Sequence, residues 1–308
     1  MNIKQEYTVY TTSFRYLRAS SLEQAGSVLA ELGEDAKALA GGQSLIPLMK
    51  LRLSRPTTLV DLNFISGISG IREQAGRLAI GAMARHADIE NSAVASKIPI
   101  LHDCAAGIAD VQVRNRGTIG GSLAEADPTG DWLPVLLTLA CEVNCVGPAG
   151  KRTIPLPDLV KDAFTTDLRA GELLREVAVK APPAKSGGAY IAFKRCAPVY
   201  ASASAAVQLE MSDHDTCKEA HIYLGCVGLT PVRASQAELE LNGKKISPKS
   251  IEAAAEAAMT AAEPASDMRG SSEYKRVLVR ALVKRALEAA LRRSRGEHVE
   301  VSHEYVGR

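Results

Sequence analysis

The sequence predicts a protein of mixed helices and strands that is organised in about two domains. Its 308 residues set the domain count, since a domain takes roughly 150 residues. A hydrophobic fraction of 46% with 23% charged residues is typical of a packed globular chain and excludes a disordered or fibrous one. Helical periodicity alternates with short apolar runs along the chain, which indicates that both kinds of element are present.

The first 61 residues predict helix, strand, glycine loop and strand in that order. A capping box at Ser20-Ser-Leu-Glu23 opens a helix, because hydroxyl and carboxylate satisfy each other's free backbone donors, and Gly33 ends that helix. A strand over 36–40 follows, then a glycine loop, a helical turn over 49–53 and a strand over 58–61.

The middle of the chain predicts a strand over 78–81, a helix over 98–109 and a buried helix over 132–140. Between the two helices, residues 110–122 are rich in glycine and arginine, which is unlike a core segment. Turn residues are concentrated at 180–188, so we expect the linker between domains there.

The last third predicts strands and two long helices. Strands are expected over 190–193 and 201–207, and Ser247-Pro248 is typical of a helix start. From Lys275 a second helix carries basic residues every fourth position. This basic face is either solvated or a surface for an acidic partner protein.

Composition argues against nucleic-acid and membrane proteins. Lys+Arg 37 against Asp+Glu 35 gives a net charge of +2, and 4% aromatic residues offer little stacking surface for single strands. The chain has neither about 18 consecutive uncharged apolar residues nor the apolar core of a signal peptide. We therefore expect a cytoplasmic chain with no membrane span.

Cysteines and histidines do not form a recognisable catalytic or metal motif. The six cysteines lie far apart without a CxxC pair, so we interpret most of them as buried thiols. Cys141 and Cys145 fall on one face of an expected strand and could be metal ligands, but no histidine or further cysteine pair completes a site. The histidines lack an HExxH pattern, and no serine lies in a GxSxG elbow. Each histidine is interpreted as a surface or capping residue.

Two glycine loops are the candidate phosphate-binding segments of the chain. Gly41-Gly-Gln-Ser44 and Gly117-Thr-Ile-Gly-Gly-Ser122 could let backbone amides converge on phosphate oxygens, because glycine has no Cβ in the way. Either loop alone could be a plain turn. Two loops, the second beside Arg114 and Arg116, favour a diphosphate held between two segments. No Gly-Lys-Ser/Thr or GxGxxG motif occurs, which excludes the P-loop and Rossmann modes.

These loops carry a family resemblance together with their neighbours. Ala40-Gly-Gly-Gln-Ser-Leu-Ile-Pro47 before Met49-Lys-Leu-Arg52, and Gln112-Val-Arg-Asn-Arg-Gly-Thr-Ile-Gly-Gly-Ser122 before Ala126-Asp-Pro-Thr-Gly-Asp131, resemble the FAD-binding medium subunit of molybdenum hydroxylases. This is the carbon monoxide dehydrogenase medium-chain type, related to the xanthine dehydrogenase flavin domain. The resemblance runs from about Phe14 to Ala290.

The resemblance implies an α+β fold. It consists of a two-lobed FAD-binding domain of the vanillyl-alcohol-oxidase type and a smaller C-terminal α+β domain. The implied boundaries are residues 12–69 for lobe 1, 70–185 for lobe 2 and 186–295 for the C-terminal domain, with terminal extensions at 1–11 and 296–308.

The resemblance also implies the residues that bind FAD. The first loop would wrap the pyrophosphate, the second would bind it from the other lobe, and Asp131 would bind the adenosine ribose. Leu174 would be an apolar contact to the flavin, and Tyr200 would lie against the flavin ring. Lys194 would be a cation near the ring that raises the flavin's redox potential, and Ile108 would line the pocket. The full set is Ala40, Gly41, Gly42, Gln43, Ser44, Leu45, Ile46, Pro47, Ile108, Thr118, Ile119, Gly120, Gly121, Ser122, Asp131, Leu174, Lys194 and Tyr200.

Two positions depart from the family pattern. Many relatives have Asn or Asp at Ser122, and many have His at Glu125. Serine keeps a hydroxyl for the phosphate, whereas Glu125 adds a negative charge near the cofactor. The cysteines do not form the extra iron-sulfur insert that some members carry.

The function implied by the resemblance is electron transfer in a complex. A large molybdopterin-containing subunit would oxidise the substrate, a small subunit with two-iron clusters would pass the electrons on, and this chain's FAD would deliver them to an external acceptor such as NAD, oxygen or a quinone. A self-sufficient FAD-dependent oxidoreductase of the same fold remains an alternative, as does an assembly subunit that has lost flavin.

Overall fold

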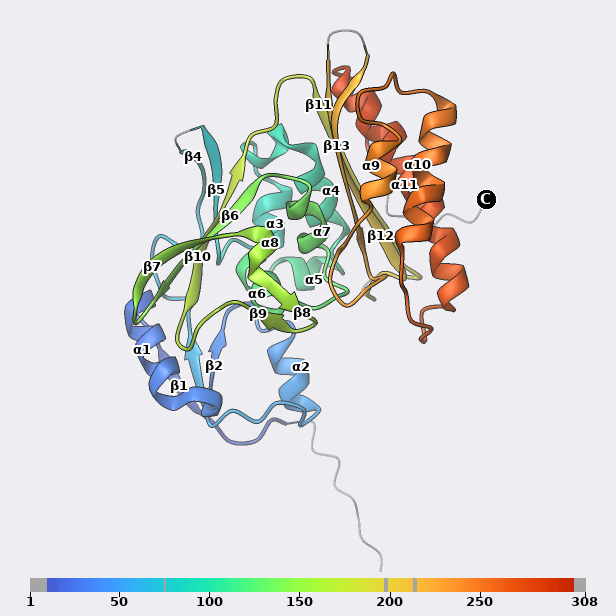
Figure 1. The fold of residues 1–308 in the computed structure, drawn as a ribbon. Helices are drawn as coiled ribbons and strands as arrows, with labels where there is room; N and C mark the ends of the chain where they lie inside the picture. Colours follow the sequence, from blue (N-terminus) through green and yellow to red (C-terminus); the bar gives the residue numbers. More distant parts are fainter. Residues whose placement is uncertain (1–9, 75, 197–198, 213–214, 302–308) are drawn as a thin grey trace, which may run out of the picture.

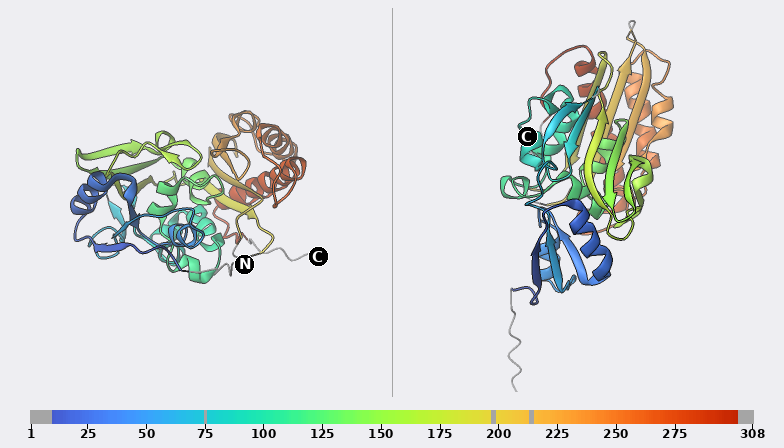
Figure 2. Two further views of the ribbon diagram at one scale, coloured as in Figure 1. Left: turned by 90° about the horizontal axis from the view of Figure 1, so that it is seen from below. Right: turned by 90° about the vertical axis from the view of Figure 1, so that its left-hand side faces the viewer.

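We describe the protein from a computed structural model, in which residues 10–74, 76–196, 199–212 and 215–301 are described. The chain forms three sheet-based units in sequence order (Figure 1). Lobe 1 lies at one end of the molecule, lobe 2 occupies the middle, and the C-terminal domain flanks lobe 2 (Figure 2). The α+β fold expected from the resemblance is confirmed.

Lobe 1 is a three-stranded parallel sheet in the order β1-β3-β2. Its elements are β1 (Arg15–Arg18), α1 (Leu22–Leu32), the 3-10 turn η1 (Gly33–Asp35), β2 (Ala36–Leu39), α2 (Leu45–Lys50) and β3 (Thr58–Asp61). The first glycine loop connects β2 to α2. Because strands β2 and β3 are parallel, the loop leaves the sheet at its carboxyl edge.

Lobe 2 is a five-stranded antiparallel sheet in the order β4-β5-β10-β6-β7, covered by short helices. The strands are β4 (Ile71–Gln74), β5 (Arg77–Gly81), β6 (Cys141–Gly147), β7 (Gly150–Pro155) and β10 (Leu173–Lys180), with a two-stranded ribbon of β8 (Val160–Asp162) and β9 (Thr165–Thr166). The helices are α3 (His86–Glu90), η2 (Ala95–Lys97), α4 (Pro99–Gly107), α5 (Val111–Arg114), α6 (Ile119–Glu125), α7 (Trp132–Leu137) and α8 (Leu156–Leu159).

The C-terminal domain is a four-stranded antiparallel sheet with helices on one face (Figure 1). Its elements are β11 (Ser186–Phe193), β12 (Ala203–Met211), β13 (Cys217–Gly225), β14 (Val232–Arg233), α9 (Ser235–Leu239), α10 (Pro248–Ala261) and α11 (Ser272–Ser294). The opposite face of the sheet packs on lobe 2, where α4 contacts β11 and α7 contacts β13.

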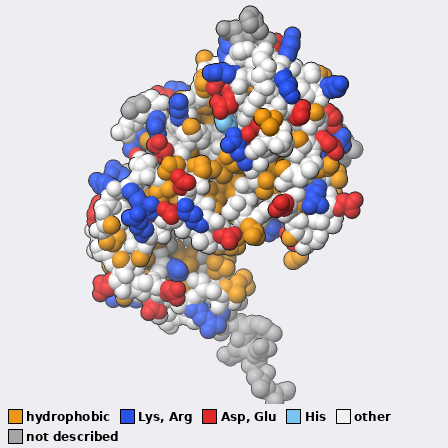
Figure 3. All heavy atoms as spheres, in the orientation of Figure 1, with side chains coloured by type: hydrophobic (Ala, Val, Ile, Leu, Met, Phe, Trp, Pro, Cys, Tyr) orange, Lys and Arg blue, Asp and Glu red, His pale blue; other side chains and the backbone are white. Residues whose placement is uncertain are grey.

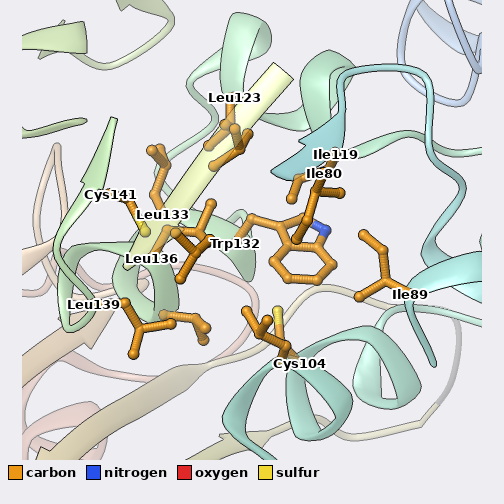
Figure 4. Close-up of a cluster of buried hydrophobic side chains, with 14 of the residues drawn as sticks. Ile80, Ile89, Cys104, Ile119, Leu123, Trp132, Leu133, Leu136, Leu139 and Cys141 are labelled. Atoms are coloured by element: carbon orange, nitrogen blue, oxygen red, sulfur yellow. The ribbon is translucent and has the colours of Figure 1, made fainter. Parts of the chain in front are cut away.

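The core of lobe 2 is a continuous apolar cluster centred on Trp132, which is fully buried (Figure 4). Ile80, Ile89 and Cys104 lie around the indole ring (Figure 4). The cluster also contains residues of β11 and β12, so lobe 2 and the C-terminal domain share it. Burial of this apolar surface therefore joins the two units.

Most elements predicted from the sequence are confirmed, and three need correction. The helical turn predicted over 49–53 lies earlier, because α2 spans Leu45–Lys50. The N-cap of α1 is Ser21 rather than Ser20: the Ser21 side chain accepts from the Gln24 amide at 3.1 Å. The Gln24 side chain accepts from the Ser20 amide at 2.7 Å, so it takes the place that Glu23 has in the predicted box. The expected linker is also shorter, because 186–188 already belong to β11.

The cysteines agree with the predicted buried thiols, with exceptions. Cys104, Cys141, Cys145 and Cys217 are buried, Cys226 is half-buried and Cys196 is exposed. Burial raises the pKa of the Cys145 thiol to about 12. Within the described ranges, no helix is long and apolar enough to cross a membrane.

Candidate functional site

The two glycine loops meet where lobe 1 joins lobe 2. A Cβ on Gly41 would clash with the Arg116 carbonyl oxygen and would lie 2.8 Å from the Gly117 Cα. A Cβ on Gly121 would lie 3.7 Å from the Ala40 Cβ. At Gly41 only glycine permits this approach, so the two loops lie against each other in the fold.

The first loop offers a run of free backbone donors. Within the part of the chain that the structure describes, the amides from Gly41 to Leu45 have no hydrogen-bond acceptor, and the next amide, of Ile46, donates to the Gly42 carbonyl at 3.1 Å. Gly42 has φ of +74°, a conformation that favours glycine. Consecutive unpaired amides in a turn form a concave site for an anion.

The second loop differs from the first, because its amides are already used. The Ile119 amide donates to the Ala84 carbonyl at 3.1 Å and the Gly120 amide to the Ala82 carbonyl at 2.8 Å. The Gly121 amide donates to the Thr118 hydroxyl, which caps α6. The first turn of α6 is thus fixed against the 82–84 bend, and the Ser122 hydroxyl remains as a donor from this lobe.

Three side chains connect the loops across the lobe junction. Asn63, after β3, donates from Nδ2 to the Ala40 carbonyl at 2.9 Å. Arg85, before α3, donates to the Asn63 side-chain oxygen and to the Arg116 carbonyl. Ser44 donates to the Glu125 carboxylate at the end of α6. The sequence analysis missed Asn63 and Arg85, because neither belongs to a motif.

Arg114, which precedes the second loop in the sequence, is engaged within lobe 2. Its guanidinium forms an ion pair with Glu90 at 2.9 Å and donates to the Ile108 carbonyl at 3.1 Å. Arg114 therefore joins α5 to α3 and to the end of α4. Arg116 is exposed.

Asp131, Lys194 and Tyr190 form a buried polar cluster between lobe 2 and β11. The Tyr190 hydroxyl donates to Asp131 Oδ1 at 2.6 Å, and Lys194 Nζ lies 3.3 Å from the same oxygen. Lys194 also donates to the Gly107 carbonyl at 2.5 Å, next to Ile108. Asp131 is 9% exposed and Lys194 6%, so the charge of each is largely neutralised by the other.

Tyr200 brings the C-terminal domain to the same region. Its side chain is 45% exposed, and the Arg269 guanidinium lies 5.4 Å from its ring centroid. Partial burial raises the pKa of its phenol to about 12, helped by the negative charges of Asp127, Glu125 and Asp131. The charges of Glu125, in α6, and of Asp127 and Asp131, after it, therefore act on the Tyr200 phenol. Leu174, by contrast, is buried in β10, opposite Cys145.

A cavity of about 550 Å³ opens beside this region. It is lined by Phe193, Lys194, Arg195, Met268, Arg269, Gly270 and Tyr274. Arginine and tyrosine side chains that are far apart in the sequence therefore line one cavity of the C-terminal domain. On the face shown in Figure 3, hydrophobic side chains gather near the centre of the molecule.

His86 is a site residue that the sequence analysis interpreted as a surface or capping residue. It is buried, its Nδ1 accepts a hydrogen bond from Trp132 Nε1 at 3.0 Å, and a Cβ on Gly117 would lie 2.6 Å from its Nε2. Burial lowers the pKa of His86 to about 4. The neutral imidazole therefore supports the second loop from behind, which only the tertiary structure reveals.

The two-lobed fold, with a glycine loop of each lobe at the junction, defines a class of flavoproteins. The model of a family described as "FAD binding domain in molybdopterin dehydrogenase" matches residues 12–182, and that of the "CO dehydrogenase flavoprotein C-terminal domain" matches residues 188–290. The chain belongs to this family of molybdenum-hydroxylase flavoproteins, and its cofactor is FAD.

Curated relatives are similar over nearly their whole length. The 6-hydroxypseudooxynicotine dehydrogenase complex subunit alpha of Paenarthrobacter nicotinovorans is 40% identical, covering 94% of this chain and 99% of its own. The carbon monoxide dehydrogenase medium chain of Afipia carboxidovorans is 40% identical over 92% of this chain and 98% of its own. The chain is thus an FAD-containing subunit of an oxidoreductase.

Solved structures agree with these relatives. A carbon monoxide dehydrogenase chain from Hydrogenophaga pseudoflava superposes with a TM-score of 0.89 at 39% identity, covering 92% of this chain and 99% of that one. A chain of quinoline 2-oxidoreductase from Pseudomonas putida 86 superposes with a TM-score of 0.87 at 36% identity over the same shares. The predicted family, fold class and cofactor are confirmed.

Proposed function

We propose that this chain is the electron-transfer subunit of a heteromeric molybdenum hydroxylase. It takes electrons from a small iron-sulfur subunit, which receives them from a large molybdopterin-containing subunit, and passes them to an external acceptor. FAD, when bound, supplies a centre that accepts electrons singly and releases them in pairs. The residues of this chain bind the cofactor, orient it and set its electrostatic surroundings.

The observation that carries this proposal is the run of free amides from Gly41 to Leu45 at the lobe junction. These donors suit the oxygens of a diphosphate, and we expect the Ser122 hydroxyl of α6 to add one more donor. The length match adds support, because the chain spans 98% of a protein named as a medium chain. This chain therefore has the length expected of the flavin subunit of a complex.

The remaining predicted site residues take roles that follow from their surroundings. Tyr200 would lie against the flavin ring, and Ile108, which follows the Gly107 carbonyl bound by Lys194, would line the pocket. Lys194 raises the flavin potential less than a lone cation would, because Asp131 lies 3.3 Å from its Nζ. Asp131 already accepts from Tyr190 and Lys194, so a ribose hydroxyl would share these oxygens.

A self-sufficient oxidoreductase is the second candidate, favoured by one observation. The cavity lined by Arg195, Arg269 and Tyr274 lies next to Tyr200 and could hold an organic substrate of its own. In the complex, the same cavity would be open to the external acceptor.

Mixing experiments separate the two candidates. The FAD-loaded chain is mixed anaerobically with the chemically reduced small iron-sulfur subunit, and flavin absorbance is followed. Rapid bleaching is expected, while aldehydes and N-heteroaromatic compounds alone leave the flavin oxidised. Bleaching by such a compound without any partner, or no bleaching by the reduced partner, would refute the electron-transfer proposal.

A further inference from the structure

Glu125 occupies a special place at the lobe junction. It is the last residue of α6, and its carboxylate accepts the hydrogen bond of Ser44 from the first glycine loop. Ser44 is flanked by the free amides of that loop. The Glu125 carboxylate is therefore hydrogen-bonded to a residue of the same loop whose amides are proposed to hold the diphosphate.

The surroundings of Glu125 do not neutralise it. In the described residues, no lysine, arginine or histidine forms an ion pair with Glu125. Ser44 from the β2–α2 loop contacts it directly, and the charge of Asp127, from the segment after α6, acts on it. The charge of Glu125 acts in turn on the Tyr200 phenol, from the segment after β11. Burial raises the pKa of this carboxyl and Asp127 raises it further, while the Ser44 hydrogen bond lowers it.

We propose that Glu125 makes FAD binding proton-dependent, because its ionised form repels the diphosphate whereas its protonated form does not. This inference rests on the proposed role of the first glycine loop. When the diphosphate binds beside Ser44, it adds negative charge close to Glu125, so binding and protonation favour each other. Each protein molecule that binds FAD in the relevant pH range takes up a proton.

The direction of the pH effect follows from linkage. FAD raises the pKa of Glu125 from its value in the free protein, so affinity is highest below the free-protein pKa and falls as pH rises through the interval between the two values. Within that interval the Kd rises by up to about tenfold per pH unit, which is the limit for one proton. Above the FAD-bound pKa it is constant again.

The test measures the Kd of the flavin-free full-length chain for FAD between pH 5 and 9, by quenching of flavin fluorescence. The wild-type Kd should rise with pH, and calorimetry in two buffers of different ionisation enthalpy should detect proton uptake. Glu125→Gln keeps the shape and the acceptor for Ser44 without the charge. It should remove the pH dependence in that interval and bind FAD about tenfold or more tightly than wild type at high pH.

Two further variants complete the test. Ser44→Ala removes the hydrogen bond that favours the carboxylate, so the midpoint of the pH profile should move upward, independently of any overall loss of affinity. Glu34→Gln removes an exposed carboxylate of lobe 1 and should reproduce the wild-type profile. If the glutamine variant does not fold, the direction of the Ser44→Ala shift decides.

The outcomes also separate this inference from the proposed function. Identical pH profiles for wild type and Glu125→Gln, or weaker binding by Glu125→Gln at high pH, would overturn the role of Glu125 while FAD binding at the loop stands. A chain that binds no FAD at any pH would instead refute the cofactor site itself.

Discussion

At the scale of residues, backbone groups define the site more than side chains do. The amides from Gly41 to Leu45 have no acceptor in the described structure, and Gly41 faces the backbone of Arg116 and Gly117 directly. A side chain at Gly41 would fill the space through which the two lobes approach each other. The close approach of the two loops therefore depends on the absence of a Cβ at Gly41.

Substitution of Gly41 by alanine should separate the loops. The added methyl group would lie 2.8 Å from the Gly117 Cα, and such overpacking typically costs about 1–3 kcal/mol of unfolding free energy. We expect lower urea stability and loss of most bound FAD, measured by absorbance after desalting. Gly70→Ala is the matched control, because a Cβ there meets nothing within 4 Å. Full FAD retention by Gly41→Ala would contradict the loop assignment.

His86 predicts a pH dependence of stability. Its pKa is about 4 in the folded chain and about 6.5 when unfolded, so the unfolded state binds more protons between these values and stability falls as pH falls through them. Between pH 7 and pH 5 the flavin-free protein should lose about 2 kcal/mol through this residue. Urea unfolding of wild type and His86→Gln checks it: the variant should show a smaller loss, and equal losses would exclude His86 as the cause.

The sequence predicts the two glycine loops, which the fold brings together, but not the side chains that support them. Glycine loops are visible in the sequence because their composition is unusual. The contacts of Arg114 with Glu90 and of His86 with Trp132 join residues 24 and 46 positions apart, and nothing local indicates them. Polar contacts between residues far apart in the sequence therefore could not be predicted.

At the scale of elements, helix α11 connects the C-terminal sheet to lobe 2. Arg293 in its last turn donates to both oxygens of Asp103 in α4, at 2.5 and 2.9 Å, and to the Gly188 carbonyl at 2.7 Å. Both charged side chains are buried, at 8% and 2% exposure. This ion pair fixes the end of α11 against α4 and against β11, the strand that contains Tyr190.

Removal of one partner of this pair should be costly. Arg293→Met leaves Asp103 buried without its cation, and breaking a buried pair typically costs about 3–5 kcal/mol. Arg292→Met is the matched control on the same helix, since its ion pair with Glu297 is solvent-exposed and should contribute about 1 kcal/mol or less. Urea unfolding of both variants compares them, and similar losses would contradict a structural role for the buried pair.

Elements were predicted well where local signals were strong. Ser247 caps α10 with Pro248 at its first position, as the sequence predicts. The basic face of α11 is partly paired within the chain, because Arg280 and Lys284 contact Glu252 of α10. Both cations remain exposed, so this pairing fits a solvated face, and it depends on how two helices pack.

At the scale of the whole molecule, three units converge on one junction. The first loop comes from lobe 1, α6 and Asp131 from lobe 2, and Tyr200 and Lys194 from the C-terminal domain. The α+β class and the family follow from two motifs about 70 residues apart in the sequence. Their meeting in space follows from the topology, which places the β2–α2 loop against the start of α6 (Figure 1).

The most direct test of the account is the FAD content of the purified full-length chain. Cofactor is released by denaturation, identified by mass and quantified against protein. We expect one FAD per chain, bound through the lobe junction and lost in the Gly41→Ala variant. A colourless chain that takes up no added FAD, or a chain that holds FMN or no dinucleotide at all, would contradict the central claim.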